Sequence, residues 1–432
     1  MVPTYDTLLA ACQPLFAQSR THRVFCQLIT AWILCTTRHT ITGLLACIPG
    51  AERRVHDVYH HFFQCACWEA DDLFDVLLVW IVRAYCPTGY LTLDLDDTLH
   101  HKSGRRVDGA GIWRDAVRST AKQVVYALGL NLIVVTLRIT PPWGGFPLAL
   151  PVRVRLHRKD GPTYFDLAEE MLRDLAALLP GCQFAVCADG FYAPLATRLP
   201  PRTTLTSRMR RDAALFDHPE PRPAGTRGRK PTKGRRLPAL KVLAAETGAL
   251  GLFSLTNMTR CQQQVERLVY ARTVRWDGLT VLLVIVRDPE GHEADDYFFT
   301  TDLTACALEV PDHYGGRWAI ELTFREVKQY LGGQEPQCWA GRGPERAAAV
   351  AYWLYTLVWV TLLLAAPTEQ QRAVRPAPWY PQKTVPSFID ALAWLRRHLW
   401  LTRISPGALL NSALAKNAED VDLLIDQVSR VA

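Results

Sequence analysis

The stretch from Tyr314 to Lys328 contains residue types at a spacing that could do chemistry on phosphates. On a helix at 100° per residue, Tyr314, Arg317, Glu321 and Lys328 fall within about 60° of arc on one face. A carboxylate can hold a divalent metal, Arg and Lys can bind phosphate, and Tyr can stack on a base. The alternative is an ordinary amphipathic helix, with Glu321 salt-bridged to Arg317 or Arg325. Gly315 and Gly316 disfavour a helix interior, which predicts that Tyr314 precedes the helix proper.

Two further carboxylates follow predicted strands. Residues Tyr90–Asp96 alternate between Leu on one side and Thr or Asp on the other, which predicts a strand ending on Asp96. A buried strand, Phe184–Ala188, is followed by Asp189. Open α/β sheets place their chemistry at strand ends. Asp96, Asp189 and Glu321 are therefore a candidate catalytic and metal site for two Mg²⁺ or Mn²⁺ ions about 4 Å apart. Asp97 is the alternative to Asp96 as the first ligand.

The elements around these acids predict a mixed α/β sheet. Residues before Tyr90 show helical spacing, and Thr40–Phe63 resembles a helix–turn–helix in which Arg53 and Arg54 lie on the second helix. The remaining expected elements are strands at Gln123–Leu128, Asn131–Arg138, Phe146–Leu156 and Thr203–Arg211, a helix at Asp166–Leu179, antiparallel strands at Val265–Val274, Leu279–Arg287 and Asp296–Thr301, and helices at Ser387–Leu401 and Gly407–Val428.

A basic, proline- and glycine-punctuated segment runs from Arg222 to Lys241 without an acidic residue. Such a segment cannot build a core, so we expect a flexible arm that binds the phosphate backbone of a nucleic acid; a solubilising loop is the alternative. The candidate DNA-binding residues in this arm are Arg229, Lys230, Lys233, Arg235 and Arg236.

Composition favours a globular protein with a polyanionic partner. The chain has 432 residues, 49% of them hydrophobic, and a net charge of +7. Its 12 cysteines show no compact disulfide framework, and Met1–Cys12 has no signal-peptide features, so we expect reduced thiols and a cytoplasmic protein. Residues Ala347–Ala366 carry no charge and would be long enough to span a membrane. A buried core helix is the preferred interpretation, with no membrane partner.

These motifs resemble bacterial insertion-sequence transposases of the DDE superfamily, in the branch with a Tyr-x2-Arg-x3-Glu-x6-Lys signature. Tyr314, Arg317, Glu321 and Lys328 meet that spacing without a gap. Leu95-Asp96-Asp97-Thr98 is similar to the family's strand ending in Asp-x-Thr/Ser. Ala188–Tyr192, Ser207–Asp212 and the Gly-Arg-Lys-Pro tract also resemble family segments. The resemblance spans roughly residues 20 to 366.

The resemblance implies an RNase H-like core interrupted by a β-rich insertion, with helical N- and C-terminal regions. It divides the chain into a helical DNA-binding region (1–85), the first part of the core (86–200), the insertion with its basic arm (201–308), the second part of the core (309–366) and a helical C-terminal region (367–432). It implies metal binding by the three acids and a grip on terminal phosphates by Tyr314, Arg317 and Lys328. An aromatic residue of the insertion, for which we nominate Trp276, would stack on an unstacked base.

The implied activity is cut-and-paste transposition, in which element ends are nicked and joined to target DNA. The implied partners are double-stranded DNA, both element ends and target, and a second copy of the chain in a homodimer on paired ends. A bacterial, nucleoid-associated location follows. The alternative is a transposase-derived DNA-binding protein that has lost catalysis.

Overall fold

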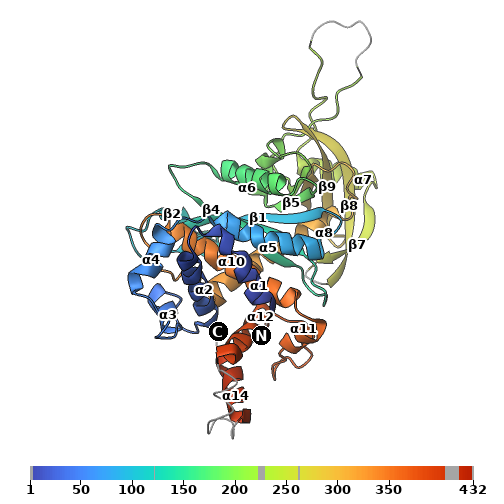
Figure 1. The fold of residues 1–432 in the computed structure, drawn as a ribbon. Helices are drawn as coiled ribbons and strands as arrows, with labels where there is room; N and C mark the ends of the chain where they lie inside the picture. The colour runs from blue at the N-terminus through green and yellow to red at the C-terminus, as the bar shows by residue number, and fades with distance from the viewer. Residues whose placement is uncertain (1–2, 121, 222–228, 261–262, 404–417, 431–432) are drawn as a thin grey trace. The chain divides into compact units, whose positions relative to one another are not determined.

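The structure is a computed structural model that describes residues 3–120, 122–221, 229–260, 263–403 and 418–430 (Figure 1). The chain forms two compact units. Unit 1 consists of Met1–Pro87, Asp97–Pro162 and Glu321–Ala432, and unit 2 consists of Thr88–Asp96 and Thr163–Ile320. Strand β1 (Tyr90–His101) and helix α9 (Trp318–Tyr330) each pass from one unit into the other.

Unit 2 is built on a mixed sheet with strand order β1–β5–β6–β10–β9–β8–β7. Strands β1, β5 and β6 are parallel, and the strands from β6 to β7 are successively antiparallel. The bounds are β5 Gln183–Ala188, β6 Thr203–Arg208, β7 Ser254–Arg260, β8 Gln263–Trp276, β9 Leu279–Arg287 and β10 Asp296–Thr300, with helices α6 Tyr164–Leu178, η2 Gly190–Thr197, α7 Leu240–Ala249 and α8 Val310–Gly315.

Local sequence accounts for several of these elements. Thr163 and Asp166 form a reciprocal capping box that starts α6. Strands β8 and β9 meet at Asp277-Gly278, whose φ angles of 44° and 81° suit the two-residue turn of a twisted hairpin. The antiparallel strands predicted between Val265 and Thr301 are therefore confirmed. Helix α7 and strand β7 were not expected.

Unit 1 combines helices with the strand order β2–β3–β1, in which β4 also pairs with β3. Its bounds are α1 Pro3–Ala11, η1 Gln13–Leu15, α2 Ser19–Leu34, α3 Ile41–Ala46, α4 His56–Gln64, α5 Ala70–Tyr85, β2 Gly111–Arg114, β3 Tyr126–Ile139, β4 Leu148–His157, α10 Gly343–Leu363, α11 Pro367–Ala373, α12 Phe388–Arg403 and α14 Ala418–Ser429. The expected helix at Gly407–Val428 lies partly outside the described residues.

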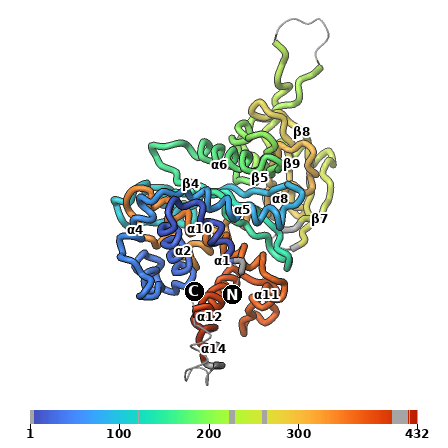
Figure 2. Tube along the Cα trace, viewed as in Figure 1, coloured from blue at the N-terminus to red at the C-terminus, as the bar shows by residue number. Residues whose placement is uncertain are grey.

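Helix α10 is the core of unit 1, where it contacts α4, α5, α12 and β4 (Figure 2). It is the one helix among the described residues long and apolar enough to cross a membrane, and its most apolar stretch is wholly buried in the protein. Two of its buried polar side chains are hydrogen-bonded within the protein: Trp353 Nε1 donates to Leu73 O at 2.8 Å and Thr356 Oγ1 to Pro151 O at 2.8 Å. The predicted buried core helix is confirmed.

Three sequence expectations need correction. Strand β1 does not end on Asp96 but continues to His101. The two strands expected between Gln123 and Arg138 are one strand, β3. Gly129 looked like a break, but a Cβ there would lie 2.4 Å from His100 O, so glycine is needed for the close approach of two backbones. The third correction concerns Arg53 and Arg54, which lie in the connection between α3 and α4 rather than on α4.

Candidate nucleic-acid and metal site

The parallel strands of unit 2 bring two of the predicted acids together. Leu95 of β1 is in register with Ala188 of β5, and Ala188 is in register with Ser207 of β6. The next residue of each strand segment is Asp96, Asp189 and Arg208, respectively. Because neighbouring parallel strands lie about 4.8 Å apart, the two carboxylates and this guanidinium occupy equivalent positions along one edge.

Asp189 is fixed at the point where β5 ends. Its carboxylate accepts a hydrogen bond from Phe191 N at 2.9 Å and thereby caps η2. Its carbonyl oxygen accepts a hydrogen bond from the buried Ser207 Oγ at 2.8 Å. Strand β6 therefore holds the end of β5 in place.

Asp96 is paired with a buried cation. Helix α8 ends at Gly315 and α9 begins at Trp318, so Tyr314 lies on the first helix and Arg317 in the break, rather than on one continuous helix. Arg317 is 7% exposed, and its guanidinium donates a hydrogen bond to Asp96 Oδ2.

Tyr314 is enclosed by cations and an aromatic ring. The Arg317 guanidinium lies 5.6 Å and the Arg208 guanidinium 5.7 Å from the centre of its ring, and Phe298 packs against it at 5.1 Å. Burial raises the pKa of the Tyr314 phenol, and Arg317 and Arg208 oppose that shift. Tyr314 thus orients two guanidinium groups beside the Asp96–Asp189 edge.

In unit 1, the rest of α9 contacts the continuation of β1. Lys328 Nζ donates to Thr98 Oγ1 at 2.7 Å. Burial lowers the pKa of Lys328 to about 8, and Asp115 opposes the shift. Because Arg317 contacts Asp96 in unit 2, the α8–α9 segment contacts β1 at two points. Glu321 lies in the first turn of α9, between Arg317 and Lys328 in sequence.

The donor set suits a hard divalent cation, since Asp96 and Asp189 offer carboxylate oxygens at equivalent positions. Within the described residues, no group of three or more His, Cys, Asp or Glu side chains is arranged to hold a metal ion. Asp96 and Asp189 belong to unit 2 and Glu321 to unit 1, so the grouping of all three stays a prediction.

The described part of the basic arm is exposed but partly ordered. Arg229, Lys230, Lys233, Arg235 and Arg236 are all exposed. Its second half is bonded to residues 215–217: Asp217 N donates to Arg235 O at 2.8 Å, and Leu237 N to Leu215 O at 2.8 Å. Residues 222–228 of the predicted arm lie outside the described residues. The arm is thus not wholly free, because its base extends the β8–β9 hairpin through Phe216.

Trp276, the nominated base-stacking residue, lies next to the base of this arm. Its ring packs against Phe299 with centroids 4.9 Å apart. It lines a cavity of about 440 Å³ together with Phe216, Lys233 and Arg275. Aromatic and cationic side chains therefore share this cavity in unit 2, as base stacking and phosphate binding require.

A match to one known family covers more than half of the chain. Residues 13–280 match a family described as DDE superfamily endonuclease. The chain belongs to the DDE superfamily endonucleases. The match includes Asp96 and Asp189 and ends before Tyr314, so it is independent of the Tyr-Arg-Glu-Lys spacing. No curated protein matches the chain.

Family membership establishes the coarse activity of this DDE endonuclease. Such enzymes are transposase-type nucleases, act on DNA and generally use divalent metal ions. A mixed α/β fold with a mixed sheet is consistent with this class.

Arg208 is the site residue that sequence reasoning missed. The segment Ser207–Asp212 was noted only for its resemblance to a family segment, without a role for Arg208. The signal that identifies Arg208 is the parallel register of β5 and β6, which requires the paired strands and cannot be read from residue spacing alone.

Proposed function

We propose that this DDE endonuclease is a cut-and-paste DNA transposase whose metal ligands are Asp96, Asp189 and Glu321. The observation that carries the proposal is the placement of Asp96 and Asp189 one residue beyond paired positions of adjacent parallel strands. Arg208 and Arg317 flank them and supply the positive charge that a phosphodiester needs. The Tyr-x2-Arg-x3-Glu-x6-Lys branch is part of the proposal.

We also propose an RNase H-like core. Strand β1 pairs with β3 of the β3–β4 hairpin in unit 1 and with parallel β5 in unit 2, giving an order β4–β3–β1–β5–β6. The antiparallel strands β7–β10 would then be the insertion that precedes α9. The five-part division at 85, 200, 308 and 366 rests on the same proposal.

In the proposed reaction, a water oxygen attacks the scissile phosphorus at an element end. The P–O3′ bond breaks, which leaves a 3′-hydroxyl and a 5′-phosphate. In strand transfer that 3′-hydroxyl attacks a target phosphodiester, and the target's own 3′-oxygen leaves. Two bound divalent cations would supply activation of the attacking oxygen and stabilisation of the leaving oxygen.

The residues of the chain have distinct roles in this scheme. Asp96, Asp189 and Glu321 would hold the two cations. Arg317, Arg208 and Lys328 neutralise the phosphates on either side of the scissile bond, and Tyr314 keeps the two guanidinium groups oriented. The residues of the basic arm and Trp276 grip DNA away from the reacting phosphate. A homodimer on paired ends, acting in the bacterial cytoplasm, completes the proposal.

The test is nicking of DNA that carries the element ends. Glu321→Gln should abolish Mg²⁺-dependent nicking and leave DNA affinity within a few-fold of the parent, because the charge that it removes repels DNA. Nicking at the parental rate by Glu321→Gln would refute the assignment. A parent protein that binds the ends but never nicks them would favour the alternative, a DNA-binding protein that has lost catalysis.

A further inference from the structure

An arginine-rich cavity lies among the helices of unit 1, outside the site described above. It has a volume of about 630 Å³ and is lined by residues that include Arg23, Arg53, Arg54, Arg403 and Glu52. Arg23 comes from α2, Arg403 from the end of α12, and the other three from the connection between α3 and α4. Glu52 is the single acidic residue among the described residues that line the cavity.

The connection that carries Arg53 and Arg54 is held rigidly against α2 and α4. Gln27 Nε2 donates to Glu52 O at 2.9 Å, the buried Tyr59 hydroxyl donates to Gln27 Oε1 at 3.0 Å, and Arg54 N donates to the Tyr59 hydroxyl oxygen at 3.0 Å. These three bonds form a chain that ties both ends of Glu52–Arg54. The arginine side chains therefore project from a preorganised backbone, which lowers the entropic cost of binding a ligand.

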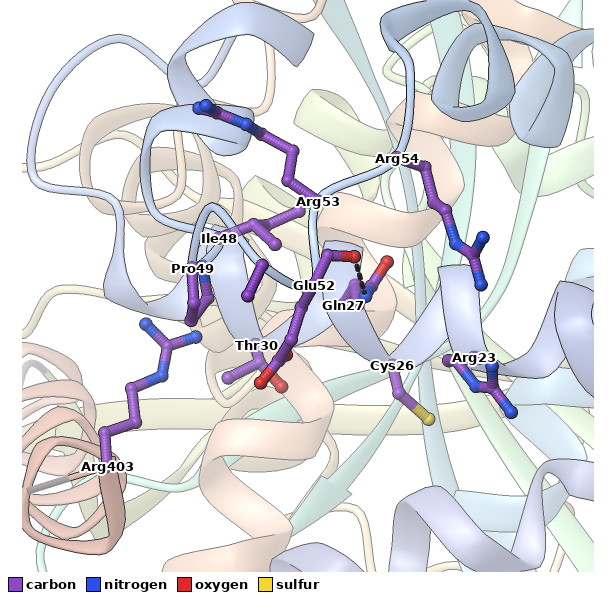
Figure 3. A pocket seen from close by; sticks show the side chains of 11 residues that line it. Arg23, Cys26, Gln27, Thr30, Ile48, Pro49, Glu52, Arg53, Arg54 and Arg403 are labelled. Atoms are coloured by element: carbon purple, nitrogen blue, oxygen red, sulfur yellow. Dashed lines mark hydrogen bonds between the residues drawn. The ribbon is translucent and has the colours of Figure 1, made fainter. Parts of the chain in front are cut away.

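Two of these arginines have no side-chain partner within the part of the chain that the structure describes. Among the described residues, neither Arg23 nor Arg54 is paired with an acidic side chain or donates a side-chain hydrogen bond. Figure 3 shows both side chains on one side of the cavity, with Arg403 on the opposite side and Glu52 between them. Arg403 is different, because its guanidinium donates to Cys47 O at 2.9 Å and helps to fix the connection.

A second cavity continues the basic surface. It has a volume of about 760 Å³, shares Arg23, Gln27 and Arg54 with the first, and adds Arg20 and His61. Guanidinium groups with no internal partner are suited to phosphate oxygens, which they can bind in a bidentate manner. Asp57 also lines the second cavity. Two adjoining cavities that share Arg23 and Arg54 can meet several phosphates in succession, which favours a strand of nucleic acid over a single small anion.

We propose that Arg23 and Arg54, flanked by Arg20 and Arg53, form a backbone clamp for duplex DNA at a distance from the reacting phosphodiester. The clamp rests on the proposed function for the identity of its partner. Since Arg53 and Arg54 lie outside α4, the clamp contacts phosphates and does not present a recognition helix to base edges. Binding through it is independent of DNA sequence.

The test is equilibrium binding of a fluorescent random-sequence duplex, followed by anisotropy as the salt concentration is varied. Arg23→Gln/Arg54→Gln should lower the slope of log K against log salt by about 1.8, because two phosphate contacts are lost. Between 50 and 200 mM salt, the parent should then lose about 12-fold more affinity than the double variant. Glu52→Gln should tighten binding a few-fold, a gain that a folding defect cannot produce.

The matched control is Arg83→Gln/Lys122→Gln, which removes the same charge from exposed positions of unit 1 that do not line either cavity. An unchanged salt slope in Arg23→Gln/Arg54→Gln, or an equal fall in the control, would overturn the clamp. Loss of inorganic triphosphate binding in the double variant, with duplex binding unchanged, would also overturn it and assign the cavity to a small anion.

Nicking at saturating DNA separates this inference from the proposed function. The double variant should nick at the parental rate once binding is saturated, because its substitutions lie outside the reacting site. A parent protein that binds the duplex through this clamp and does not nick in Mg²⁺ would defeat the proposed function alone.

Discussion

The contact between Arg317 and Asp96 permits a quantitative prediction about stability and metal. Arg317→Gln leaves the Asp96 carboxylate beside a neutral amide, and removes one of the two guanidinium groups over the Tyr314 ring. Breaking a buried ion pair costs about 3–5 kcal/mol. The Asp96 side chain retains 18% exposure, so solvent screening reduces the expected loss to about 2–3 kcal/mol.

Thermal unfolding, followed by intrinsic fluorescence, measures this loss. At about 2–4 °C per kcal/mol for a unit of this size, Tm should fall by about 5–10 °C. Arg325→Gln is the matched control, since Arg325 is exposed on the same helix α9, and we expect a Tm change of less than about 1 °C. Mg²⁺ at ten times its dissociation constant should restore about 1.4 kcal/mol to Arg317→Gln, because the cation replaces the lost charge at Asp96.

A double-mutant cycle with Asp96→Asn decides whether the pair causes the effect. Once Asp96 is neutral, Arg317→Gln should cost at least about 1 kcal/mol less than it does in the parent. An equal cost in both backgrounds would show that the two side chains are not coupled. The absence of any extra Mg²⁺ stabilisation in Arg317→Gln would contradict metal binding at Asp96.

Three further predictions concern other parts of the molecule. Lys328→Ala should weaken binding to element-end DNA and lower the slope of log K against log salt by about 0.9. In the parent protein, DNA affinity should fall as pH rises through about 8, where Lys328 loses its proton. A DNA affinity of the parent that does not depend on pH would count against phosphate contact by Lys328. Burial raises the pKa of Glu326, which accepts a hydrogen bond from Tyr355, to about 7. The folded state then binds more protons than the unfolded state between about pH 4.5 and 7, so the free energy of unfolding falls as pH rises through that window. In chemical denaturation, Glu326→Gln should raise the free energy of unfolding at pH 8 by about 1–3 kcal/mol and leave it unchanged near pH 4. Replacing the five basic residues from Arg229 to Arg236 with Gln should lower DNA affinity and leave Tm unchanged. Substitution is preferred to deletion of the arm, because deletion would also remove the buried Leu237 and Leu240 and so change stability.

The sequence predicted the elements whose own pattern of apolar residues is enough to identify them. Strand β9 and helix α10 were both predicted, because their apolar runs are long and uninterrupted. The extension of β1 to His101 was missed, because its second half carries charged residues whose burial depends on pairing in unit 1. The glycine within β3 was taken for a break, because only the neighbouring backbone reveals the need for it.

In the candidate site too, some residues could be identified from local sequence and others only from the fold. Asp96 and Asp189 could be chosen from sequence because each is adjacent to a recognisable apolar strand. Arg208 could not be chosen, because its place beside Asp189 depends on the register of two strands. The contact between Arg317 and Asp96 was also beyond sequence reasoning, since more than two hundred residues separate them in the chain.

The claim that Asp96, Asp189 and Glu321 bind a shared pair of cations is tested most directly by a crystal structure of the protein with element-end DNA and Mn²⁺. Anomalous scattering locates manganese without reference to the protein coordinates. We predict two manganese peaks about 4 Å apart, with oxygen ligands from all three carboxylates and the scissile phosphate beside them. Manganese bound elsewhere, or bound without Glu321, would contradict the proposed site.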